Sequence, residues 1–133
     1  MSEEIIKQWL DMVSHTVAAK DINAHLDLIS RNVKLTGVPG FELIDYANWA
    51  RQCQHEFSNN LIRSVVYKGL QMRETATSRI LFKTLETVTA ADGSDNAQGI
   101  EVLLEKEADG KWRVTQERIL PADESRHDGL VTA

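Results

Sequence analysis

The sequence predicts one α+β domain, on three observations. Residues 1–57 carry apolar side chains at helical spacing, interrupted by one short strand at 33–36. The stretches 61–74, 77–90, 98–107 and 111–120 are rich in β-branched, leucine and aromatic residues, as strands are. Turn signals separate these stretches, above all an Asp-Gly pair at 109–110. Helices followed by a run of strands indicate three helices packed on one face of an antiparallel sheet.

Each expected helix has a start signal or an apolar face. The first follows Ser2, a capping residue with two acids behind it, and extends to about residue 19. The second, shorter helix begins after Asp21 and is expected to carry Ile29 on its apolar side. The third runs from about residue 43 to 57 and has one apolar face, which consists of Tyr46, Trp49, Ala50, Cys53 and Phe57.

Composition and charge exclude several classes of protein. The 133 residues suffice for one domain, which we expect at 1–121, followed by a polar tail at 122–133 that frays. No apolar run approaches the roughly 20 residues of a membrane span, and the N-terminal stretch lacks a signal-peptide layout. A cytoplasmic location is therefore expected. The formal charge of −5 argues against nucleic acid as a partner. The single cysteine, Cys53, excludes an internal disulfide and is interpreted as buried apolar filler.

The order of elements resembles the nuclear transport factor two-like superfamily, which includes SnoaL-like polyketide cyclases and ketosteroid isomerases. The stretches GFELIDYANWARQCQHEF (40–57) and DGKWRVTQERILP (109–121) contribute to this resemblance, which covers residues 3–120. It implies a cystatin-like, strongly curved antiparallel sheet, wrapped around the three N-terminal helices into a cone with an internal pocket. It also implies a homodimer that pairs through the outer face of the sheet.

The same resemblance disfavours ketosteroid isomerase chemistry. Those enzymes place a tyrosine in the first helix, a general-base aspartate at the turn after the short strand, and a second acid on a long strand. These positions fall on Val13, on Gly37 and near Glu101 in this chain. Two of the three groups are therefore absent, and glycine has no side chain that could remove a proton. A working acid would have to lie deeper in the sheet.

Three side chains are candidate acid–base groups: His25, Glu86 and Glu101. His25 lies on the apolar side of the second helix, either as a pocket acid or base or as a buried histidine bonded to a backbone carbonyl. Glu86 alternates in phase with Phe82, so it shares an apolar strand face, where burial would raise its pKa. The alternative is simple ion pairing on a solvated or dimeric face, including a pair between Glu86 and Arg118.

The walls of the pocket are expected from the third helix and from two strands. On the last strand, Gln116 and Arg118 are in phase with Trp112 and Val114, and this phase is assigned as inward. On the strand that contains Gly69, a bulge near that residue could shift the alternation by one. No pair of histidines with a carboxylate has metal-ligand spacing, so neither a metal nor a cofactor is expected. The expected ligand-binding residues are Tyr46, Trp49, Phe57, Phe82, Gln116 and Arg118.

These observations predict a SnoaL-like domain whose pocket binds a small, largely apolar organic molecule. One hypothesis is an enzyme of the lyase, isomerase or hydrolase type that uses a pocket carboxylate. The alternative is a non-catalytic binding or accessory module, motivated by the two missing acid–base groups. A third hypothesis is a protein-interaction domain that presents its outer sheet face to a partner chain.

Overall fold

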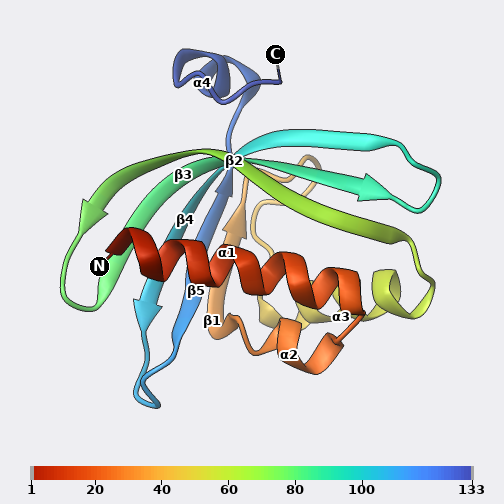
Figure 1. Cartoon of the computed structure of the whole chain (residues 1–133), viewed down its shortest axis with the longest axis horizontal. Coiled ribbons are helices and arrows are strands. Elements are labelled where there is room, and N and C mark those ends of the chain that lie inside the picture. The colour runs from red at the N-terminus through yellow and green to blue at the C-terminus, as the bar shows by residue number, and fades with distance from the viewer. Residues whose placement is uncertain (1, 133) are drawn as a thin grey trace.

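The structure is a computed structural model that describes residues 2–132. It confirms the predicted α+β class, with most of the helices before the four long strands (Figure 1). No helix among the described residues is long and apolar enough to cross a membrane. In chain order the elements are α1 (Ser2–Ala19), α2 (Ile22–Leu26), β1 (Ile29–Thr36), α3 (Tyr46–Ser58), β2 (Ile62–Thr75), β3 (Arg79–Ala90), β4 (Asp95–Lys106), β5 (Trp112–Ile119) and α4 (Ala122–His127).

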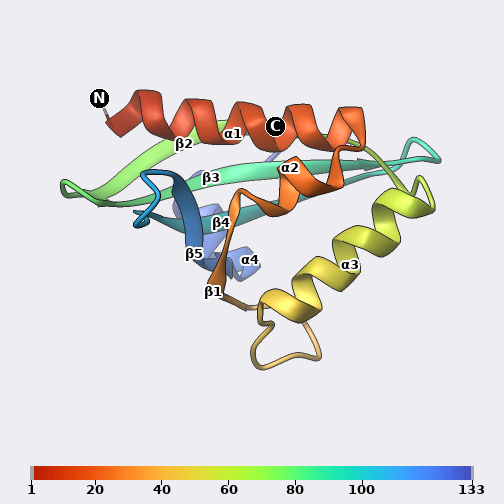
Figure 2. The same cartoon turned by 90° about the horizontal axis from the view of Figure 1, so that it is seen from below.

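The five strands form one sheet in the order β1-β5-β4-β3-β2. Strands β2 to β5 are antiparallel neighbours, as predicted, whereas β1 pairs with β5 in parallel. Parallel pairing is open to β1 because a long connection separates it from β5. The strand begins at Ile29, so the assignment of that residue to the second helix is wrong. Seen from below, β1 and β5 turn away from the plane of the other strands, and the sheet is curved (Figure 2).

Side-chain caps fix the starts of α2 and α3. The predicted cap of α2 is confirmed, since the Asp21 carboxylate accepts a hydrogen bond from the backbone N–H of Ala24 at 3.2 Å. Asp45 caps α3 in the same way and accepts from the N–H of Asn48 at 3.0 Å. This cap explains why α3 begins at Tyr46 and not at about residue 43, because a capping residue itself has a non-helical backbone.

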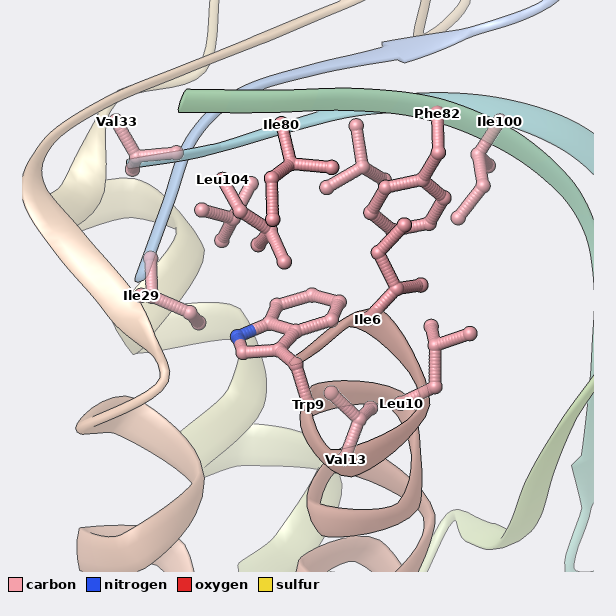
Figure 3. Packing of buried hydrophobic residues seen from close by; sticks show 12 residues of the cluster. Ile6, Trp9, Leu10, Val13, Ile29, Val33, Ile80, Phe82, Ile100 and Leu104 are labelled. Carbon is pink, nitrogen blue, oxygen red and sulfur yellow. The ribbon is translucent and has the colours of Figure 1, made fainter. Parts of the chain in front are cut away.

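The main core lies between α1 and the face of the sheet turned toward it, which we call the inner face. Figure 3 shows side chains of α1 pointing at this face. Burying a large apolar side chain contributes about 1.5–3 kcal/mol. The Trp9 indole N–H donates to the carbonyl of Leu28 at 3.1 Å, which holds the ring beside α2. Prominent members of this core are Ile6, Trp9, Leu10, Val13, Ile80, Phe82, Ile100 and Leu104.

The C-terminal segment is ordered, so the expectation that residues 122–133 fray is wrong for most of its length. Residues 122–127 form α4, which Figure 1 shows beyond the end of β5. The Ser125 hydroxyl donates to the carbonyl of Leu130 at 2.7 Å and closes the turn after the helix. Leu130 is only 2% exposed and forms a small second core with Leu85 and Leu120.

Of the shifts in strand register along the sheet, two β-bulges concern the side chains near the site directly. The predicted bulge near Gly69 is confirmed: the register of β2 with β3 shifts between Lys68 and Gln71, and Gly69 has φ +73°. A second bulge lies on β5, where adjacent residues of β4 pair with Gln116 and Val114. Thr115 is therefore an extra residue, and every side chain after it faces the side opposite to that expected from simple alternation.

Candidate functional site

A cavity of about 310 Å³ lies between the inner face of the sheet and helices α1, α2 and α3. Most of its wall is apolar. Of the residues expected to bind a ligand, Trp49 and Phe57 line it. The lining side chains that carry an aromatic ring or a polar or ionisable group are Trp9, His25, Trp49, Cys53, Glu56, Phe57, Tyr67, Glu86, Gln98 and Glu117.

Glu86 is the predicted candidate carboxylate that lines the cavity, and it has a defined partner there. The Tyr67 hydroxyl donates to its Oε2 atom at 2.9 Å across the β2–β3 pair. Gln98 faces Glu86 in the neighbouring strand β4. Burial raises the pKa of the Glu86 carboxyl, and the hydrogen bonds from Tyr67 and Gln98 partly oppose that rise. Glu86 is thus an oriented carboxylate and a stronger base than a solvated one.

Glu117 is a second cavity carboxylate, and the bulge at Thr115 turns it inward. Its side chain is on the same face as Val114, and the residue is only 8% exposed. Among residues 2–132 we find no hydrogen bond or ion pair for this carboxyl. Burial first, and then the nearby charge of Glu86, raise its pKa well above the ordinary value. These two effects favour the protonated form of Glu117.

His25 lies at the α2 side of the cavity and is neutral near pH 7, because burial lowers its pKa to about 4. Its Nδ1 atom shares a hydrogen bond with the hydroxyl of Thr16 at 2.9 Å. Its ring centroid is 5.1 Å from that of Phe57. The bonding partner is thus a threonine side chain, which differs from both a free pocket base and the expected backbone carbonyl.

Cys53 is buried at the wall of the cavity. Burial raises the pKa of its thiol to about 12, so the nucleophilic thiolate is scarce at neutral pH. This agrees with the interpretation of Cys53 as a small apolar filler.

Glu101 and Arg118 lie on the outer face of the sheet, away from the cavity. The Arg118 guanidinium contacts Glu101 at 3.2 Å and Glu124 of α4 at 2.7 Å. The sequence expected Arg118 in the pocket, and the bulge at Thr115 reverses that placement. These charges attach α4 to the sheet and do not meet Glu86, so the alternative pairing of Glu86 with Arg118 is wrong.

Three more of the expected ligand-binding residues lie elsewhere. Gln116 is exposed on the outer face, for the same reason as Arg118. Phe82 is 0% exposed and packs within the main core. Tyr46 lies at the start of α3 under the guanidinium of Arg31, 5.2 Å from the ring centroid. None of the three lines the cavity.

The turn after β1 cannot carry the aspartate that ketosteroid isomerases keep there. Gly37 has φ +85°, a conformation that side chains disfavour. A Cβ atom at this position would also overlap the backbone carbonyl of Ile119. Val13, at the position of the isomerase tyrosine, lines the cavity as an apolar residue. The structure therefore gives a physical reason for the missing base, because backbone fills its place.

Sequence reasoning missed Tyr67, Gln98 and Glu117. The first two alternate in phase with inward residues of their strands, such as Val65 and Ile100, and this alternation was a usable signal. Glu117 had no such signal, because its direction depends on the bulge at Thr115. Among residues 2–132, no group of three or more histidine, cysteine or acidic side chains is placed to hold a metal ion.

Comparison with solved structures shows which fold this is. An NTF2-like protein (nuclear transport factor two-like) from Cytophaga hutchinsonii superposes with a TM-score of 0.74 at 13% identity, covering 90% of this chain and 97% of that one. A protein of unknown function with a cystatin-like fold from Nostoc punctiforme gives 0.67 at 11% identity, covering 90% and 92%. The chain has the nuclear transport factor two-like fold, which confirms the predicted resemblance at the level of fold.

One similar structure carries the name of an activity. A candidate scytalone dehydratase from Novosphingobium aromaticivorans superposes with a TM-score of 0.72 at 8% identity, covering 89% of this chain and 82% of that one. No family model matches the sequence, and no curated protein does. At such identity the likeness concerns the fold alone, and activity has to be argued from the site.

Proposed function

We propose that the protein is an acid–base enzyme of the lyase or isomerase type that acts on a small, largely apolar molecule held in the cavity. One observation carries the proposal: two carboxyl groups, the half-buried Glu86 and the buried Glu117, face the same cavity from strands β3 and β5. Coupled acids of this kind hold one proton between them over a range of pH, which supplies an acid and a base together. A dehydratase among the similar folds is compatible with this chemistry.

The two carboxyls have different partners and therefore different roles. Glu86 accepts a hydrogen bond from Tyr67, which favours its ionised form relative to that of Glu117. We assign it as the base that takes a proton from a carbon of the substrate. Glu117 has no partner among the described residues, and we assign it as the group that meets the polar end of the substrate. The largely apolar wall lowers the local dielectric constant, which strengthens both interactions.

A general-base probe tests the assignment of Glu86. A carboxylate opens 5-nitrobenzisoxazole by removing its ring C–H proton, as the N–O bond breaks and gives a coloured cyanophenolate. We expect the protein to accelerate this reaction, and Glu86→Gln to lower the rate about 100-fold, the usual contribution of a positioned base. Glu101→Gln is the matched control, because Glu101 lies on the outer face. Equal rates for Glu86→Gln and the unchanged protein would refute the assignment.

A non-catalytic binding module is the second candidate. The replacement of two isomerase groups by Val13 and Gly37 favours it. In that case small apolar molecules would raise the melting temperature, while neither the probe reaction nor any conversion of the bound molecule would depend on Glu86.

A further inference from the structure

We infer that the cavity binds a small organic cation, with a protonated nitrogen that lies against Glu117 and between aromatic rings. This inference rests on the proposed function, because it names the class of molecule that the same cavity holds. It starts from the charges of the wall. Within residues 2–132, three glutamates line the cavity, Glu56, Glu86 and Glu117, and no lysine or arginine does.

The other ionisable groups in or near the wall do not neutralise this excess of acidic side chains. His25 is neutral near pH 7, because burial lowers its pKa. Lys20 lies outside the lining, and its ammonium group donates to the backbone carbonyl of the lining residue Ile62 at 2.6 Å. The carboxyl groups therefore face the cavity without a positive partner from the lining residues, and those that are ionised give the cavity a negative charge. An anionic ligand would meet repulsion there, and a cation would meet attraction.

Glu117 is the group with an open position for the ligand. It is more than nine-tenths buried, it lines the cavity, and among residues 2–132 we find no hydrogen-bond donor for its carboxyl. Buried carboxylates are otherwise paired, because an unpaired buried charge is strongly unfavourable. An ammonium group would supply the missing donors. A neutral amine that enters can take the proton of the Glu117 carboxyl, and an ammonium–carboxylate pair results with no other reactant.

Aromatic rings provide the second half of a cation site. Trp9, Trp49, Phe57 and Tyr67 all line the cavity. The faces of such rings attract cations, most strongly where water is excluded. Trp9 and Tyr67 are also held in place by hydrogen bonds through their polar atoms. The same rings accept the apolar part of the ligand, so a small arylalkyl or cycloalkyl amine matches both the charge and the wall.

Calorimetric titration of the intact protein at pH 7.5 with three probes of similar shape tests the inference. Benzylamine is cationic, benzyl alcohol is neutral and benzoate is anionic. We expect benzylamine to bind at least about tenfold more tightly than benzyl alcohol, and benzoate more weakly than both. In Glu117→Gln, the affinity for benzylamine should fall to that for benzyl alcohol. The affinity for benzyl alcohol itself should change by no more than about threefold. Glu101→Gln, on the outer face, should change neither.

Two results would overturn the inference. One is an unchanged protein that binds benzyl alcohol or benzoate as tightly as benzylamine, or that binds none of the three. The other is a folded Glu117→Gln variant that keeps the preference for the amine. The first comparison needs no variant, so it holds even if Glu117→Gln fails to fold. The proposed function is tested separately by the nitrobenzisoxazole reaction. That probe is neutral and reports on Glu86, so the cavity can fail either test without failing the other.

Discussion

Replacing Glu117 by glutamine should stabilise the protein, and by more as the pH rises. The glutamine has nearly the same shape but carries no charge, so the change removes the ionisation of a buried, unpartnered carboxyl. The pKa of Glu117 is raised in the folded protein, which therefore binds more protons than the unfolded chain above about pH 4.3, the ordinary glutamate pKa. The free energy of unfolding consequently falls as pH rises from there through the folded pKa.

The size of the effect follows from that linkage. Within the window between the two pKa values, the loss is at most about 1.4 kcal/mol for each pH unit. We therefore expect Glu117→Gln to gain about 1–3 kcal/mol over the unchanged protein between pH 4.5 and pH 7.5. For a chain of this size this corresponds to a relative rise in melting temperature of about 3–5 °C per kcal/mol.

Thermal unfolding followed by circular dichroism at several pH values measures this difference. Glu101→Gln is the control: it loses the ion pair with Arg118, so it should be no more stable than the unchanged protein at any pH. A Glu117→Gln variant that is less stable at pH 7.5, or a difference that does not vary with pH, would refute the reasoning. Either result would mean that the Glu117 carboxylate is ionised at little cost.

Three further predictions concern single contacts. Gly37→Ala should lower stability in urea by about 1–3 kcal/mol, since φ is +85° and the Ile119 carbonyl is adjacent; unchanged stability would contradict the close approach. Leu130→Ala should cost about 2–5 kcal/mol in the same assay, whereas a frayed tail would give no change. Tyr67→Phe removes a bond that lowers the pKa of Glu86, so the acid limb of the nitrobenzisoxazole pH–rate profile should move to higher pH; a fixed limb would argue against the contact.

Most of the fold could be predicted from short local signals in the sequence. The cap at Asp21, the glycine turn after the first strand and the Asp-Gly hairpin each act within a few residues, and the structure agrees with them. The bulge near Gly69 was predictable for the same reason, since glycine readily takes the positive φ that the bulge needs. The long apolar strands followed from composition alone.

The residues of the site could not be predicted in the same way, because their placement depends on features without a local sequence signal. Nothing local marks Thr115 as a bulge, yet that one extra residue moves Glu117 into the cavity and takes Gln116 and Arg118 out of it. Tertiary contacts likewise decide the fold of the C-terminal segment, because Leu130 packs against Leu85 of the distant strand β3 as well as against Leu120. The fold could therefore be predicted correctly while an error in the phase of one strand, β5, still misplaced the residues of the site.

The central claim is that Glu86 and Glu117 face one cavity and that the ionisation of each affects the pKa of the other. A carbon-13 NMR titration of the glutamate carboxyl groups tests it directly, with Glu86→Gln and Glu117→Gln used to assign the two resonances. Two carboxyls that titrate above the ordinary glutamate value of about 4.3, with a shift of one when the other is replaced, are the predicted result. Two carboxyls that titrate independently at or below that value would contradict the account.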